Sequence, residues 1–253
     1  MNEGNNIVVL SDSYTQFYKT DGSLIKKRQH TYTNSVLYVS GEKVLIYENG
    51  GNELSVEDEK EVFYTKSFDE NILFARLSPE GYTGIVTTSD NNKCEIHIYD
   101  KKGQMVYERK CIELVNDLCF INESGGCFIS YIQAENGQLT TNIQCVNFNE
   151  KGDLWTSTGI DTVGLELCSF NGSAFLLGVD ACSYIDENGQ ISNFYPYDGD
   201  IAGGACSNGQ SAVIINNDDR RKYIVALFSS SSSEPKIIEL SEPAVDVSVD
   251  NGL

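Results

Sequence analysis

Basic residues are scarce in this sequence. There are 18 Lys and Arg against 37 Asp and Glu, which gives a formal net charge of −19. Binding to nucleic acid or to anionic lipid headgroups depends on Lys and Arg neutralising negative charge, so this balance disfavours both. The only two basic triplets, residues 26–28 and 220–222, are interpreted as solvated strand or loop. We therefore expect no nucleic-acid partner.

Long apolar runs are also missing. No stretch of about 18 apolar residues exists, so the sequence predicts no membrane-spanning segment. Residues 1–6 have neither a basic region nor an apolar stretch, so they do not form a signal peptide. The start is that of a trimmed domain or of a cytoplasmic chain, and the sequence does not separate the two.

Histidine occurs only twice, which is too few for most hydrolytic zinc sites. His97 shares a strand face with Glu95 and Tyr99, because side chains alternate along a strand. The trio could form an acid–base or metal corner. Packing between sheets, or exposure to solvent, is the favoured interpretation. We assign no catalytic, cofactor-binding or metal-binding residue and expect no cofactor.

Eight cysteines are present, but none forms a CxxC pair. Several lie in apolar, strand-like contexts, where a free cysteine behaves as a small buried hydrophobe. We expect mostly buried thiols, with one or more disulfides as the alternative. Cys119 and Cys127, on either side of a turn at residues 122–126, are the pair expected to face each other.

Proline occurs only four times, and no segment has convincing helical spacing. Alternation with period two is frequent, and turns rich in Gly, Asn and Asp recur about every 8 to 12 residues. Tyr and Phe are abundant, with 14 and 11 copies. These features predict an all-β fold of short antiparallel strands.

A short phrase recurs six times: an apolar or aromatic residue, then polar residues, then a turn glycine. It occurs at residues 18–22, 47–51, 99–103, 148–152, 185–189 and, with serines in place of the glycine, 228–233. A second element, two apolar strands around a polar turn, begins near residues 35, 72, 115, 163 and 201. A repeat of about 40 to 45 residues is typical of a four-stranded propeller blade. The phrase would join strands three and four, and the second element strands one and two.

The two ends suggest how such a fold is completed. Residues 5–33 supply three strands, and residues 244–250 supply one more. We predict a single domain over residues 1–253: a β-propeller with six four-stranded blades, whose first blade is closed by strand 244–250. The alternative is a truncated propeller of seven or eight blades. The serine run at residues 229–233 is expected to form a long loop within a blade.

Three stretches carry a family resemblance: Thr31 to Gly51, Ile72 to Thr88 and Ile96 to Gly103. Together they resemble the domain-of-unknown-function family 5711 of Gram-positive, mostly clostridial bacteria. The resemblance implies a β-propeller outside the membrane, tethered by an N-terminal helix that this sequence lacks. It implies no activity and no functional residues.

Other candidate motifs have structural explanations. The charge run at residues 56–61 is interpreted as a solvated loop, and so is the acidic stretch 198–200. The acidic turns at residues 186–189 and 216–219 lack the spacing of a calcium loop, and Asp, Asn and Gly are what turns require. Residues 148–155 match the Asp-box turn of sialidase-type propellers only weakly, so Trp155 is expected to pack between blades.

The sequence therefore favours a non-catalytic platform at the cell surface that binds a protein or a glycan, and we expect a monomer. The alternative is a glycan-processing or lactonase-like enzyme with its site at the channel mouth. An enzyme requires clustered titratable groups in a pocket, whereas a platform requires exposed apolar residues on one face or rim. The strand at residues 201–206 is apolar and small, which favours the platform. The expected location is extracytoplasmic, with the cytoplasm as the alternative.

Overall fold

The computed structural model describes residues 6–249 except 122–124, 136, 150–151, 171, 208 and 230–233. These residues form strands, turns and bends, and no helix is found among them. Consequently, no helix in the described part of the chain is long and apolar enough to span a membrane. The chain divides into two compact units, Met1–Glu113 and Leu114–Leu253.

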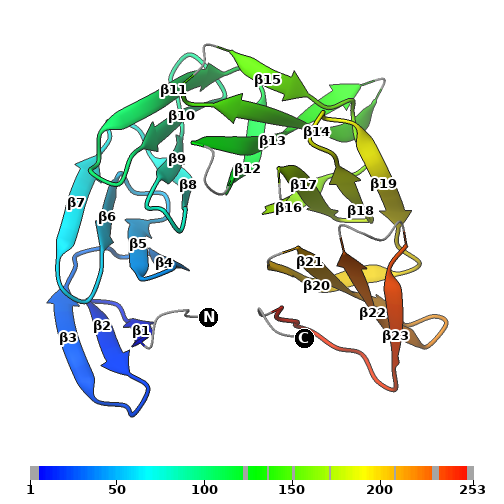
Figure 1. Cartoon of the computed structure of the whole chain (residues 1–253), viewed down its shortest axis with the longest axis horizontal. Coiled ribbons are helices and arrows are strands. Elements are labelled where there is room, and N and C mark those ends of the chain that lie inside the picture. The colour runs from blue at the N-terminus through cyan, green and yellow to red at the C-terminus, as the bar shows by residue number, and fades with distance from the viewer. Residues whose placement is uncertain are drawn as a thin grey trace. The chain divides into compact units, whose positions relative to one another are not determined.

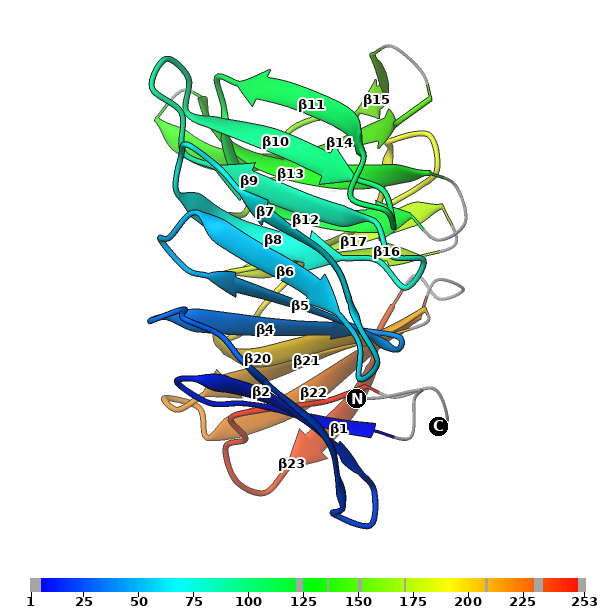
Figure 2. The ribbon, with the colours of Figure 1, turned by 90° about the vertical axis from the view of Figure 1, so that its left-hand side faces the viewer.

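The first unit contains three antiparallel sheets (Figures 1 and 2). Their orders are β1-β2-β3, β4-β5-β6-β7 and β11-β10-β9-β8. The strands are β1 (Asn6–Leu10), β2 (Tyr14–Lys19), β3 (Leu24–Gln29), β4 (Ser35–Ser40), β5 (Lys43–Glu48), β6 (Glu53–Glu57), β7 (Val62–Ser67), β8 (Ile72–Leu77), β9 (Thr83–Thr87), β10 (Cys94–Tyr99) and β11 (Met105–Cys111).

The second unit also contains three sheets, each of four strands in chain order. The strands are β12 (Leu114–Ile121), β13 (Gly126–Glu135), β14 (Gln138–Asn147), β15 (Asp153–Thr156), β16 (Gly164–Phe170), β17 (Ser173–Gly178), β18 (Ala181–Ile185), β19 (Ile191–Pro196), β20 (Asp200–Ser207), β21 (Gln210–Asn217), β22 (Lys222–Ser229) and β23 (Lys236–Leu240). The six sheets have the composition expected of six blades, with one strand missing from the first.

Position within a sheet explains the sequence pattern of each strand. The middle strands β5, β9, β17 and β18 are buried almost throughout, and they read as near-continuous apolar runs because both faces are covered. The last strands, such as β7 and β19, alternate between exposed and half-buried residues. This alternation is the period-two signal in the sequence.

The turns use their acidic residues internally. The Asp100 carboxylate accepts hydrogen bonds from the backbone N–H groups of Lys102 and Gln104, at 2.9 and 2.8 Å. Asp186 does the same for the turn that precedes β19. A glycine closes each turn in the left-handed region, with φ of 73° at Gly103 and 80° at Gly189. The recurring phrase is therefore a hairpin turn.

One assignment of that phrase is wrong. It joins strands three and four of a sheet at residues 99–103 and 185–189, as predicted, and the last two strands of the three-stranded sheet at residues 18–22. Residues 47–51, however, join β5 to β6, which are strands two and three of their sheet. The third and fourth strands of that sheet are joined at residues 58–61, where the Asp58 side chain accepts the backbone N–H groups of Lys60 and Glu61. An aspartate caps the turn without a glycine, so the phrase is not needed there.

The five expected strand starts agree with the structure: β4, β8, β12, β16 and β20 begin at residues 35, 72, 114, 164 and 200. Four of these strands carry a register shift one or two residues after their start. In each, one residue has no partner on the next strand: Leu73, Asn116, Leu165 and Ala202. This repeated bulge marks equivalent positions in successive sheets.

The C-terminal segment is not assigned to a strand over residues 243–249. Within its own unit it lies along β20 and β21: the Asn216 side-chain amide donates to the Ala244 carbonyl at 2.8 Å, and Val245 passes close to Gly203. Closure of the first sheet by this segment stays a prediction. The serine loop expected at residues 229–233 falls, except for residue 229, outside the described residues.

The cysteine pairing differs from the expected one. Cys168 on β16 and Cys206 on β20 form a disulfide with a Cα–Cα distance of 6.4 Å, within the usual range. Cys119 is opposite Phe128 and Cys127 is opposite Phe120, so the two thiols point to opposite faces of their sheet. Neither forms a disulfide, and nor do the remaining four cysteines. The sequence spacing did not show that the register places Cys127 one residue away from the position opposite Cys119.

Candidate functional site

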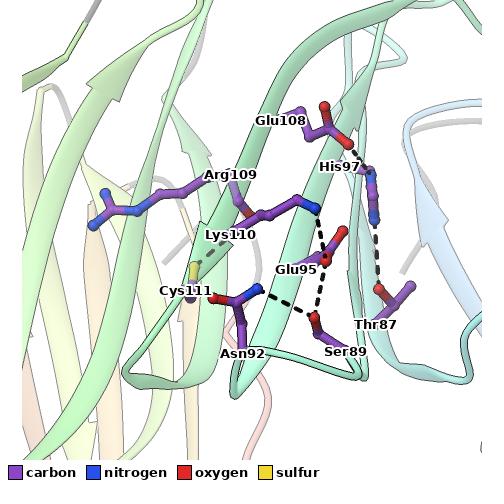
Figure 3. Close-up of polar contacts among 9 residues, drawn as sticks. All are labelled: Thr87, Ser89, Asn92, Glu95, His97, Glu108, Arg109, Lys110 and Cys111. Atoms are coloured by element: carbon purple, nitrogen blue, oxygen red, sulfur yellow. Dashed lines mark hydrogen bonds and ion pairs between the residues drawn. The ribbon is translucent and has the colours of Figure 1, made fainter.

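The strongest titratable cluster of the first unit lies on one face of β10 (Figure 3). The Glu95 carboxylate forms an ion pair with Lys110 Nζ at 3.6 Å and accepts a hydrogen bond from the Ser89 hydroxyl at 2.9 Å. Two residues along the strand, the His97 ring lies between Thr87 and Glu108. The strand places the predicted trio Glu95, His97 and Tyr99 on one face, as expected from its alternation.

Aromatic packing covers this face from the neighbouring sheet. The ring of Phe68, just after β7, lies 5.5 Å from the ring of His97 and 6.3 Å from that of Tyr99. Lys66 Nζ lies 4.6 Å from the centre of the Tyr99 ring, a cation–π distance. His97 is therefore packed between two sheets, which was the favoured interpretation of the sequence.

Burial sets the ionisation of His97. Loss of solvent lowers its pKa, and the nearby carboxylates of Glu108 and Glu95 partly oppose this effect by favouring the charged ring. The imidazole is thus neutral at neutral pH. Glu108 Oε1 lies 3.8 Å from Nδ1, which is too far for a hydrogen bond.

The order of groups Thr87, His97 and Glu108 is that of a hydrolase triad, but the geometry does not support this chemistry. The Thr87 hydroxyl lies 3.4 Å from His97 Nε2 and Thr87 is only 1% exposed. A substrate carbonyl could not approach a hydroxyl buried this deeply. The described residues also contain no group of three or more His, Cys, Asp and Glu placed to hold a metal ion.

A second polar contact of this unit was missed in the sequence. Glu57, read as part of a solvated charge run, is 3% exposed, and its carboxylate lies 3.5 Å from the Arg28 guanidinium. Arg28 also donates to the carbonyl of Asp58. Burial raises the pKa of Glu57, and Arg28 offsets this only in part. The basic triplet and the acidic run therefore meet as an ion pair between β3 and β6.

In the second unit, a buried carboxylate joins two sheets. Asp117 on β12 is 1% exposed, and its Oδ2 accepts the backbone N–H of Leu167 on β16 at 2.8 Å. Its Oδ1 accepts the N–H of Leu118 at 2.8 Å. The neighbouring Asn116 donates to the Gly164 carbonyl at 3.0 Å. Nothing in the local sequence distinguishes Asp117 from a turn aspartate, so only the fold reveals this role.

The remaining sequence candidates have structural roles. The Trp155 ring lies 5.5 Å from the ring of Phe128 and packs directly against Gly189 of the next sheet's hairpin turn. It therefore packs between two sheets, as expected. In the turn at residues 216–219, the Asn217 side chain binds the backbone instead of an ion. Asp198, beside it, is paired with Arg220 at 2.9 Å and Lys222 at 3.7 Å. Residues 150–151 of the Asp-box segment lie outside the described part of the chain.

A pocket of about 350 Å³ opens at one end of the last sheet. Leu227, Phe228, Pro235 and Val249 supply apolar walls, and Gln210, Ser211, Ser229, Glu234 and Lys236 supply polar groups. The volume is at the lower end of the range for small-ligand sites. Its lining contains one carboxylate and no histidine or cysteine. Such a lining can bind an amphipathic group, and its titratable side chains are Glu234 and Lys236.

Large apolar residues are exposed on the last strands of the second unit. Ile191 and Phe194 on β19 are 36% and 41% exposed, and Ile237 and Ile238 on β23 are 42% and 41% exposed. Both strands are the outermost of their sheets, so one backbone edge of each has no strand partner among the described residues. β23 is short and carries Lys236 and Glu239, but its two exposed isoleucines leave an apolar edge that a partner could cover.

The fold is shared with solved propeller structures. The computationally designed protein Ika8 matches with a TM-score of 0.69 and 11% identity, over 98% of this chain and 76% of that one. A eukaryotic initiation factor matches with a TM-score of 0.61 and 12% identity, over 94% of this chain, which spans only 63% of its length. BamB from Moraxella catarrhalis matches with a TM-score of 0.56 and 11% identity, over 98% and 89%. The chain is thus an all-β propeller.

A search of curated protein sequences finds no match. One family, described as a family of unknown function, DUF5711, matches residues 1–235, and this confirms the resemblance drawn from the repeated strands. Because the match covers nearly the whole chain, the protein belongs to the DUF5711 family.

Proposed function

We propose that the chain is a non-catalytic propeller platform that acts outside the cytoplasm and binds a protein partner along the last strands of its second unit. The observation that carries this proposal is the exposure of Phe194, Ile237 and Ile238 on unpaired strand edges. A strand added to β23 would satisfy its unpaired backbone edge and lie beside Ile237 and Ile238, one on each face of the sheet, and Phe194 on β19 would supply a second contact. A glycan, which stacks on sugar platforms of aromatic rings, is less well served by isoleucines.

Two further observations support the proposal. The Cys168–Cys206 disulfide fits an oxidising compartment, since such bonds are rare in the cytoplasm. The triad-like group at His97 is closed to substrate, and the pocket of the last sheet is lined by one carboxylate and by no histidine or cysteine. A tether to the membrane, in sequence beyond this chain, is part of the proposal because the family resemblance implies it.

Photo-crosslinking tests this function. A benzophenone amino acid replaces Ile238, and the purified chain is mixed with a cell-envelope extract. We expect a crosslinked protein band that disappears when the extract is first treated with protease, and that Phe194→Lys reduces severalfold. The matched control places the crosslinker at Leu139, which is equally apolar and 53% exposed on β14.

The opposite results are equally clear. A crosslink of the same strength from Leu139 would show non-specific adhesion and contradict a docking edge on β23. Binding that survives protease treatment but is lost after periodate oxidation of the extract would replace the protein partner with a glycan. Hydrolysis of a glycan or lactone by the chain would replace the platform with the enzyme.

A further inference from the structure

Two cysteines of the first unit that form no disulfide lie opposite each other on neighbouring strands. Cys94 is the first residue of β10 and Cys111 is the last residue of β11, and the two are direct partners in the antiparallel register. Partners in such a register project their side chains to the same face, with Cβ atoms about 4.5 to 5.5 Å apart. Both residues are buried, at 0% and 2% exposure.

The two thiols interact with each other as well as with the backbone. The Cys94 thiol donates to the carbonyl of Glu113 at 3.6 Å, and that of Cys111 contacts the Arg109 carbonyl at 4.0 Å. A contact with Cys94, together with burial, raises the pKa of Cys111. Cys111 is thus held as a protonated thiol, which is a poor nucleophile, and Cys94 is buried beside it.

We propose that Cys94 and Cys111 form a second disulfide bond when the chain folds under oxidising conditions, and that this bond fastens the outermost strand of the sheet β8–β11. It links the two chain positions at the open end of the β10–β11 hairpin, opposite the turn at residues 100–103. This inference concerns the first unit alone and does not depend on the binding function.

The geometry requires only a small movement. A disulfide needs Cβ atoms about 3.5 to 4.5 Å apart, so the strands must approach by up to about 1 Å. β11 is the last strand in the order β11-β10-β9-β8, so it can move towards β10 without breaking a second ladder. The Cys168–Cys206 bond shows that this fold already accommodates a link between strands.

The reaction is a thiol–disulfide exchange. The oxidant is a disulfide of the glutathione or oxidoreductase class. A thiolate of Cys94 or Cys111 attacks one of its sulfurs and expels the other as a thiolate. The second cysteine then attacks the mixed disulfide, forms the Sγ–Sγ bond and releases the second thiol of the oxidant. The protein loses two protons and two electrons, and the oxidant becomes two thiols. Because both folded thiols are buried and cannot be reached by the oxidant, this exchange takes place before β11 has docked.

Alkylation mass spectrometry on the unmodified chain tests the proposal. The chain is refolded in a buffer of reduced and oxidised glutathione, denatured in N-ethylmaleimide, digested and mapped without reduction. We expect a linked peptide pair that contains Cys94 and Cys111, in addition to the pair that contains Cys168 and Cys206. Cys119 and Cys127, which are closer in sequence than Cys94 and Cys111 but point to opposite faces, serve as the control and should both be alkylated.

Alkylation of Cys94 and Cys111 in oxidised chain that retains the Cys168–Cys206 link would overturn the proposal, as would a link from either residue to a third cysteine. A second measurement needs a variant. Cys94→Ala/Cys111→Ala should lower the midpoint of thermal unfolding of the oxidised chain by several degrees, whereas Cys119→Ala/Cys127→Ala should give the same shift with and without reductant. Equal shifts for the first variant in oxidised and reduced chain would also contradict the bond.

Discussion

The two units differ in one kind of joint between sheets. In the first unit, Arg28 pairs with Glu57, Phe68 covers His97, and the backbone of Ile72 is hydrogen-bonded to residues 50–51 of the preceding sheet. In the second unit, Asp117 accepts the Leu167 N–H, and Cys168 is covalently bonded to Cys206. Non-covalent contacts tolerate small displacements, whereas the disulfide holds β16 against β20. The second unit should therefore resist local opening more strongly.

Removing the covalent link should have the largest effect. The disulfide closes a loop with a sequence separation of 38, and for that length the chain-entropy estimate is about 4 kcal/mol. We expect Cys168→Ala/Cys206→Ala to lower the free energy of unfolding by roughly this amount, measured by urea unfolding of the oxidised chain. Under reductant, the variant and the parent chain should differ far less. A variant that is as stable as the oxidised parent would remove the disulfide from the comparison.

The two buried carboxylates should respond differently when each is replaced by its amide. Both oxygens of Asp117 accept backbone N–H groups. In Asp117→Asn, the side-chain NH₂ group would face one of these N–H donors, donor against donor, and the substitution should cost about 2 to 3 kcal/mol. Glu57 has a raised pKa and one oxygen without a hydrogen-bond partner, so Glu57→Gln removes a burial penalty along with the ion pair. Its cost should stay within about 1 kcal/mol.

Urea unfolding at neutral pH measures both amide variants, with the exposed Asp219→Asn as the control. Equal costs for Asp117→Asn and Glu57→Gln would mean that burial, and not the groups each carboxylate contacts, determines its contribution. That result would contradict the expected difference between the two buried carboxylates.

Two turn glycines separate local strain from packing. Gly22 and Gly189 have nearly the same φ, 83° and 80°, but an added Cβ meets nothing at Gly22 and lies 2.6 Å from the Trp155 ring at Gly189. Gly22→Ala should cost about 1 kcal/mol from the left-handed backbone alone. Gly189→Ala should cost about 1 to 2 kcal/mol more because the tryptophan must shift. Thermal unfolding of the two variants checks the difference, and equal losses would show that Trp155 is loosely packed.

The repeat explains why the sequence predicted the fold so well. Turn residues and period-two strands are local signals, and they located the starts of β4, β8, β12, β16 and β20 to within one or two residues. The phrase at residues 47–51 gave a wrong assignment because a glycine turn fits any hairpin, whether it joins strands two and three or strands three and four. Nothing in a local pattern encodes that choice.

The joints between sheets could not be predicted in the same way. Asp117, Glu57 and Cys168 each have partners tens of residues away, and their local contexts resemble a turn, a charged loop and a plain apolar strand. Cys119 and Cys127 show the converse: their nearness in sequence suggested a pair, but the hairpin register separates their faces. The face assignment of His97 followed from the sequence because alternation along a single strand is local, and the packing of Trp155 between sheets was also expected.

The smallest expected effect is a pH response confined to the first unit. Both histidines, His30 and His97, belong to the first unit, and the second unit contains no histidine. Burial lowers the pKa of His97 below its unfolded value of about 6.5, so the unfolded state takes up a proton first as the pH falls. This contribution to stability is complete above about pH 6.5 and is lost progressively below it. The raised pKa of Glu57 acts in the opposite direction at lower pH, since the folded carboxyl group takes up its proton first.

Hydrogen exchange followed by mass spectrometry can isolate this response. The parent chain and His97→Gln are compared at about pH 7.5 and about pH 5.5, so that the intrinsic pH dependence of exchange cancels between the two proteins. On acidification, the β10 peptides of the parent should lose protection relative to those of His97→Gln, because only the parent carries the imidazole whose protonation favours the open state. Peptides from β17 and β18 should show no difference between the two proteins. An equal change in both units would mean that they open together, and the disulfide between β16 and β20 would then have no consequence for local stability.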